Sequence, residues 1–166
     1  MRALLLIVST LSILIAVALP AMARPIDGSG PADLVVVMKS ERVLYLYQSG
    51  EIVAQYPIAL GAAPLGTKQM AGDNKTPIGA YTLDWRNPDS DFHRSLHISY
   101  PDAEDRANAA VLGVPAGSNI MIHGQPGYDN RLRTGDWTNG CIAVSDAAID
   151  DIWSRVADGT PIHIYP

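Results

Sequence analysis

Short apolar runs, each closed by a cluster of Gly, Pro, Asn or Asp, are the feature that most restricts the possible folds of this chain. The run at 34–38 is continuous and β-branched, which predicts a buried strand. The runs at 43–47 and 52–58 flank the turn residues 48–51 and predict a β-hairpin. Further strands are predicted at 79–85, 95–100, 120–122 and 161–165. The pattern favours a mostly β domain.

The spacing of the apolar residues becomes helical only near the C-terminus. The stretch 146–157 has its apolar residues at i, i+3, i+4 and i+7, and Ser145 before it is a good N-cap. This predicts an amphipathic helix that buries Trp153. A shorter helix is predicted at 103–112, after the capping residue Asp102. The expected fold class is therefore α+β, mostly β with one or two packed helices.

Two segments are predicted to be loops or turns. The segment 61–77 is rich in Gly, Pro, Asn, Asp and Lys, and it is interpreted either as a functional loop and candidate lid or as a mobile surface excursion. The segment 86–91 is interpreted as a turn cluster. On the strand that follows, His97 alternates with apolar neighbours and is predicted to face polar surroundings.

The N-terminus has the composition of a Sec-type signal peptide. Residues 1–23 combine a basic start, the apolar stretch 3–19 and the small residues 21–23 of a cleavage site. We expect cleavage, export, and a periplasmic or cell-wall location; the alternative is an uncleaved anchor, which would be the one expected membrane contact. Residues 24–31 are interpreted as a linker, and 32–166 as one domain.

Charge and ligand spacing exclude several functions. Without residues 1–23 the chain has 11 Lys and Arg against 17 Asp and Glu, a formal charge of −6. Nucleic acid is therefore not an expected partner. The four histidines do not follow a zinc pattern, because His93 and His97 are four apart on a predicted strand, where such residues do not converge. No metal and no cofactor are expected.

The single cysteine is the strongest chemical signal. Cys141 follows an Asn-Gly turn and begins an apolar run, and His123 ends another apolar run just before Gly124. Both residues are thus predicted at strand-loop junctions, where a nucleophile and a base can meet. An unpaired thiol in an exported protein suggests use, although an inert buried Cys is the alternative. If the imidazole activates it, the thiol should be accessible and have a depressed pKa.

Five segments in order resemble the L,D-transpeptidase (YkuD-type) catalytic domain, whose members act on bacterial peptidoglycan. They cover almost the whole mature chain and are the opening strand 33–39, the segment 75–81, His123-Gly124, the segment 138–142 and the segment 158–162. The family fold is a compact domain with a mixed, curled sheet around the catalytic Cys. The resemblance implies the same fold here.

The resemblance also implies roles for individual residues. Cys141 is the nucleophile and His123 the general base, oriented by the backbone carbonyl of Gly124. Backbone N–H groups around Asn139 and Gly140 form the oxyanion hole. The implied substrates are peptidoglycan stem peptides, with a cell-wall-linked protein as a further possible partner.

The sequence departs from the commonest family pattern on both sides of the nucleophile. Thr138-Asn139-Gly140 stands where Ser-His-Gly is usual, and Ala143 replaces an Arg or Asn that binds substrate. Arg131 and Arg133 are interpreted as substitutes for that contact, with Thr138 as a further substrate-binding residue; the alternative is that the arginines are solvated loop charges.

Three functions are compatible with these residues. The leading hypothesis is acyl transfer from a tetrapeptide stem to an amine through a Cys141 acyl-enzyme, with loss of D-alanine. The second is hydrolysis of the same acyl-enzyme, as by an L,D-carboxypeptidase or an amidase that releases a wall-linked group. The segments 84–100 and 136–138 resemble a branch of the family that includes such hydrolases. The third, a non-catalytic wall-binding module, needs neither His123 nor Cys141.

Overall fold

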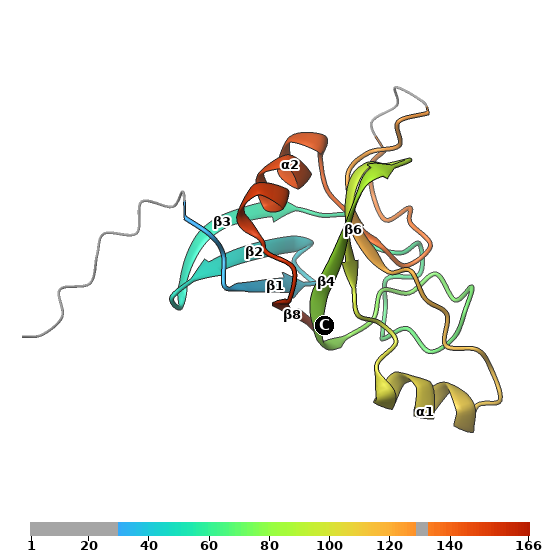
Figure 1. Ribbon diagram of the computed structural model, residues 1–166. Helices are drawn as coiled ribbons and strands as arrows, with labels where there is room; N and C mark the ends of the chain where they lie inside the picture. Colours follow the sequence, from blue (N-terminus) through green and yellow to red (C-terminus); the bar gives the residue numbers. More distant parts are fainter. Residues whose placement is uncertain (1–29, 129–132) are drawn as a thin grey trace, which may run out of the picture.

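A mixed sheet of eight strands forms most of the domain (Figure 1). The computed structural model describes residues 30–128 and 133–166, so the predicted signal peptide, nearly all of the linker and Arg131 lie outside the described residues. In chain order the strands are β1 (Leu34–Met38), β2 (Val43–Gln48), β3 (Glu51–Pro57), β4 (Gly79–Ser90), β5 (His93–Ile98), β6 (Met121–His123), β7 (Ile142–Ala143) and β8 (Thr160–Tyr165).

The strand order is β3-β2-β1-β8-β4-β5-β6-β7. The pairs β1–β8 and β6–β7 are parallel, and the other neighbouring strands are antiparallel. The β2–β3 hairpin and the mostly β fold predicted from the sequence are confirmed.

The sheet curls until its two ends meet. Ala59, just after β3, exchanges two backbone hydrogen bonds with Ala143 of β7, at 2.8 and 2.9 Å. Two residues further on, Gly61 forms a bridge with Thr138. The segment that leads into the predicted nucleophile therefore lies against the chain that leaves the opposite edge of the sheet.

Helix α2 (Asp146–Arg155) covers one side of the sheet (Figure 1). Ser145 caps it as predicted, with its hydroxyl accepting from the Ala148 N–H at 3.2 Å. Its buried face includes Ile149 and Ile152, which are fully enclosed. The prediction that the helix buries Trp153 is wrong: this ring is only half-buried, and the Arg86 guanidinium lies 4.9 Å from its centroid. The smaller isoleucines fit under the helix, and the indole lies at its edge.

Helix α1 (Ala103–Val111) projects away from the sheet (Figure 1). Asp102 and Asp105 form a capping box at its start. Of the helical residues only Ala109 is buried, so the helix contributes little to the core. Neither helix of the described ranges is long and apolar enough to cross a membrane.

The predicted turn at 86–91 is largely strand. Pairing between β4 and β5 continues through Asn87↔Ser95 to Ser90↔His93, and only Asp91 and Phe92 make the turn. The segment was predicted to be a turn because the Asn, Pro and Asp residues of β4 favour turns when judged from the sequence alone. The pairing is irregular between Asn87 and Ser90, which accommodates a residue without an N–H such as Pro88.

The long loop 61–77 is held to the domain by buried polar contacts. Lys68 forms an ion pair with Asp73 at 2.8 Å, and both side chains are almost fully buried. Thr76 accepts from the Gly61 N–H through its hydroxyl at 3.1 Å and from Lys39 Nζ through its carbonyl at 2.8 Å. These contacts fix the loop behind the turn that carries Cys141.

Candidate active site

The sheet register places the thiol and the imidazole on one face. Ile122 pairs with Ile142 and His123 with Ala143. Paired residues of neighbouring strands point to the same side, and side chains alternate along each strand. The two isoleucines enter the core, so His123 on β6 and Cys141, the residue just before β7, both point to the opposite face. Both side chains line one cavity of about 400 Å³.

A backbone carbonyl fixes the His123 imidazole. Its Nδ1 lies 2.8 Å from the Gly124 carbonyl oxygen, the contact that the family resemblance implied. A carbonyl only accepts, so Nδ1 carries the hydrogen and Nε2 is left as the acceptor. The Phe92 ring, with its centroid 4.6 Å away, and the Trp137 ring at 5.6 Å enclose the imidazole. Burial lowers the pKa of His123, and the Gly124 hydrogen bond offsets this only in part, so the ring is neutral at pH 7.

The thiol of Cys141 differs from expectation. It is half-buried, and its Sγ lies 3.6 Å from the Asn119 carbonyl oxygen. Burial raises its pKa above the ordinary value, more than the Met121 N–H and the charge of Lys68 lower it. The predicted depressed pKa is therefore wrong for the resting protein. The physical reason is burial, which disfavours the charged thiolate, and the neutral His123 imidazole supplies no positive charge to offset it.

Thr138 shapes the turn before the nucleophile. Its hydroxyl donates to the Cys141 carbonyl at 2.7 Å and accepts from the Gly140 N–H at 3.1 Å. The side chain is buried, so the hydroxyl that was predicted to bind substrate is engaged inside the protein. Because the Gly140 N–H donates to this hydroxyl, it points into the turn. Asn139 is exposed and lies at the edge of the cavity.

Gly140 occupies a position that excludes a side chain. Its φ of +128° is unfavourable for any residue with a Cβ, and an added Cβ would lie 2.7 Å from the Lys75 carbonyl oxygen. The loop 61–77 thus approaches the turn closely enough to require glycine next to the thiol.

The structure describes one of the two loop arginines, Arg133. Arg131 lies outside the described residues, and its predicted role stays a prediction. Arg133 lines the cavity, with its guanidinium 5.3 Å from the Trp137 ring centroid. Ala143 is buried at the closure of the sheet, so no substrate contact is available at that position.

Several cavity residues were not predicted from the sequence. Besides Phe92 and Trp137, the wall includes Ser95, which pairs directly with His123, and Asn119. Ser95 alternates with the apolar residues of β5, and this was the one available signal for its placement. Phe92 was hidden because it lies just after the segment 86–91, which was interpreted as a turn cluster.

A second cavity reaches the thiol from another direction. It has a volume of about 490 Å³ and shares Cys141, Asn119 and Asn139 with the first. Its other walls come from the loop 61–77 and from residues 117–120. The thiol therefore lies where two cavities meet.

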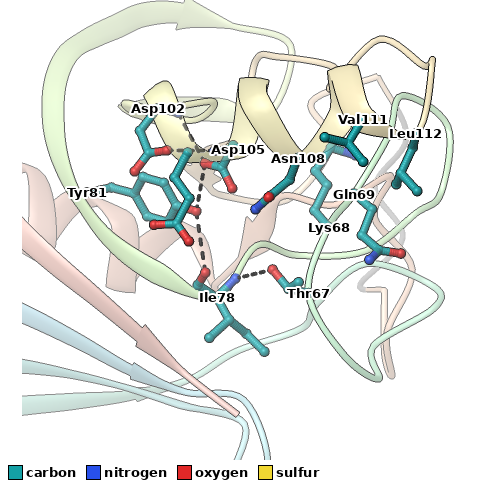
Figure 2. A pocket seen from close by; sticks show the side chains of 11 residues that line it. Thr67, Lys68, Gln69, Ile78, Tyr81, Asp102, Asp105, Asn108, Val111 and Leu112 are labelled. Carbon is teal, nitrogen blue, oxygen red and sulfur yellow. Dashed lines mark hydrogen bonds between the residues drawn. The ribbon is translucent and has the colours of Figure 1, made fainter.

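A third cavity, of about 410 Å³, lies between α1 and the loop 61–77 and has no thiol or imidazole in its wall (Figure 2). Two of its carboxylates, Asp102 and Asp105, already have structural partners. Asp105 accepts from the Tyr81 hydroxyl at 3.0 Å and caps α1 together with Asp102. Within residues 30–128 and 133–166 no three His, Cys, Asp or Glu side chains gather as metal ligands.

A curled sheet that presents a thiol beside a neutral, carbonyl-bound imidazole places this chain among domains suited to thiol acyl chemistry. The family model of the L,D-transpeptidase catalytic domain (YkuD) matches residues 32–164. The protein belongs to this family.

Relatives and solved structures agree with that assignment. The chain is 32% identical over 152 residues to the putative L,D-transpeptidase YafK of Escherichia coli K12, covering 82% of this chain and 55% of YafK. It superposes on the helical cell shape determining protein Pgp2 of Campylobacter jejuni with a TM-score of 0.63 and 26% identity, over 81% of this chain and 48% of Pgp2. Bd1075 of Bdellovibrio bacteriovorus has the same fold, with a TM-score of 0.59, 24% identity, and coverage of 82% and 48%. The chain spans about half the length of these proteins.

Proposed function

We propose that the protein is a cysteine acyltransferase that acts on peptidoglycan stem peptides. In this reaction Cys141 attacks the carbonyl of the diamino-acid residue of a tetrapeptide stem, D-alanine leaves, and the acyl group passes to an amine. The observation that carries the proposal is the placement of His123 and Cys141 on one face and in one cavity, with the thiol also lining a second cavity. Family membership and the cell-shape role named for Pgp2 support the substrate class.

The proton is transferred in the reaction because the resting pair is neutral. His123 Nε2 takes the thiol proton as Sγ bonds to the carbonyl carbon, and the Gly124 carbonyl stabilises the imidazolium through Nδ1–H. The imidazolium then protonates the leaving amine of D-alanine, and a thioester remains. An acceptor amine attacks the thioester, gives its proton to His123, and leaves the thiol restored.

The negative oxygen of the tetrahedral intermediate needs nearby donors. We assign this role to backbone N–H groups of the turn Asn139–Cys141. Of these, the Gly140 N–H already donates to Thr138, so Asn139 and Cys141 are the better candidates. Thr138 contributes by fixing the turn, and Arg133 lines the cavity where a stem carboxylate would enter.

Hydrolysis through the same residues is the second candidate. Two cavities at one thiol suit a donor and an acceptor peptide, which favours transfer. The buried Ala143 favours hydrolysis, because the position offers no polar side chain to hold a second peptide. Both reactions pass through the same thioester and differ in whether an amine or water resolves it.

Purified muropeptides with an excess of an amine acceptor distinguish the candidates. Mass spectrometry should detect the exchanged product, whose yield rises with amine concentration. A free acid whose yield is independent of the amine would assign the protein as a hydrolase. Cys141→Ser and His123→Ala should abolish either product, and turnover by both variants would refute the proposed site.

We also propose export through the segment 1–23, followed by action in the periplasm or at the cell wall. N-terminal sequencing of the protein from the extracytoplasmic fraction should give a start near Arg24. An intact Met1 on soluble protein would contradict this.

A further inference from the structure

A β-bulge stacks an exposed indole on a mostly buried imidazole, on the face of the sheet that carries Cys141. The register between β4 and β5 shifts between Leu83 and Trp85, so that Asp84 and Trp85 both face His97. The Trp85 and His97 rings stack with centroids 4.9 Å apart and planes at 18°. His97 Nδ1 lies 2.6 Å from Asp84 Oδ1, which fixes the imidazole under the indole. We name Asp84, Trp85 and His97 the aromatic platform.

The indole of Trp85 and the carboxylate of Asp84 are exposed, whereas the His97 ring beneath them is mostly covered. Trp85 is 43% exposed, whereas the core of this sheet region is supplied by Leu83 and Ile98, which are fully buried. Thr82 and Ser99, which are hydrogen-bonded to each other, lie next to the platform, so its surroundings are polar. A flat ring within a polar surface suits a ligand that has both an apolar face and many hydroxyl groups.

The sheet register connects the platform to the thiol. His97 pairs with Met121, which lines the catalytic cavity, and Cys141 lies one residue before the pair Ile122↔Ile142. A row across the sheet therefore runs from Trp85 through His97 and Met121 to Cys141, on one face. Three strand spacings give a separation of roughly 14 Å between its ends.

We propose that the aromatic platform binds the N-acetylated amino sugar to which the stem peptide is attached. This inference rests on the proposed function. The C–H groups of a pyranose ring carry partial positive charge and stack on the negative face of an indole. The second carboxylate oxygen of Asp84 can accept a hydrogen bond from a sugar hydroxyl. With Cys141 at the carbonyl of the third stem residue, three extended residues span about 10 Å, and the ether link to the sugar adds the remainder.

Paired substrates test this inference on the mature chain. The disaccharide-tetrapeptide and the free tetrapeptide have the same reacting bond and differ only in the sugar. Trp85→Ala should lower kcat/KM for the disaccharide-tetrapeptide by about 3- to 10-fold, the effect of one aromatic stacking contact, and leave the free peptide unchanged. Trp85→Phe keeps an aromatic ring, so it should retain most of the native difference in kcat/KM between the two substrates.

Tyr165→Ala is a matched control. Tyr165 is 45% exposed and also contacts a histidine, His163, but it lies on β8, on the side of β4 away from the catalytic cavity. Loss of the Tyr165 ring should leave kcat/KM unchanged for both substrates. If Trp85→Ala lowers turnover of both substrates equally, or of neither, the inference is overturned.

A binding measurement separates this inference from the proposed function. The indole N–H resonance of Trp85, assigned by its absence in Trp85→Phe, should shift when the peptide-free N-acetylated disaccharide is titrated into the Cys141→Ser variant. No shift overturns the inference even if both substrates are turned over. A shift without turnover by the native protein would retain the sugar site and refute the proposed reaction.

Discussion

The hydroxyl of Thr138 should determine both the stability of the catalytic turn and the rate of the reaction. Thr138→Val keeps the shape of the buried side chain but removes the bond to the Cys141 carbonyl at 2.7 Å and the bond from the Gly140 N–H at 3.1 Å. A buried backbone group left without a partner costs about 1–3 kcal/mol. With two such groups and partial relaxation of the turn, we expect a loss of about 2–4 kcal/mol in the free energy of unfolding.

The effect on turnover should exceed the effect of unfolding alone. The same turn positions the Cys141 thiol and its neighbouring N–H groups, and a displacement of about 1 Å lowers rates by roughly 10²-fold. Urea denaturation and muropeptide turnover, both measured on protein that is still folded, separate the two effects.

Thr138→Ser is the matched control, because it keeps both hydrogen bonds and removes one buried methyl group, a loss of about 1 kcal/mol. It should retain most of the activity. If Thr138→Val is as stable and active as the native protein, or if Thr138→Ser is impaired equally, the hydroxyl does not organise the turn.

Three further perturbations test other parts of the structure. Gly61→Ala should destabilise strongly and reduce turnover, since its Cβ would overlap the Asn74 carbonyl oxygen; wild-type thermal stability would contradict the packing. Alkylation of Cys141 by iodoacetamide should still accelerate above pH 9.0, the ordinary pKa that burial raises, and a rate plateau near pH 7 would indicate a preformed thiolate. Asp136→Asn should destabilise by about 1 kcal/mol at pH 7, because the hydrogen bond from Arg42 and other contacts outweigh burial and lower the Asp136 pKa. That difference should narrow as the pH falls below 3.8, the ordinary value, and a constant difference would assign the effect to something other than charge.

Most strands, both helices and the positions of His123 and Cys141 at strand ends could be predicted, because their sequence signals are local. Each of these signals comes from residues that are close in the sequence: the alternation in the apolar runs, the Ser145 cap, and the strand-loop junctions at His123 and Cys141. The continuation of β4 past Arg86 depends instead on pairing with β5, which overrides the turn propensity of its Asn, Pro and Asp residues.

The chemistry of the site was less predictable than its residues. Phe92 and Trp137 enclose the imidazole only after the sheet has curled, and burial of the ring lowers the pKa of His123, so the resting imidazole is neutral. The hydroxyl of Thr138 had a clear donor and acceptor capacity, but the sequence did not indicate whether it faced substrate or backbone. Both features follow from three-dimensional enclosure, for which residue spacing has no signal.

The closure between Ala59 and Ala143 protects the strand next to the nucleophile from other chains. Strand β7 has only two residues, and as an open edge it would offer free N–H and C=O groups for strand addition by a neighbouring molecule. Because the Ala143 N–H and C=O are both bonded to Ala59, an extended peptide cannot bind by adding to this strand. Slow hydrogen exchange at the Ala143 amide, unchanged by added peptide, is the expected signature of this arrangement.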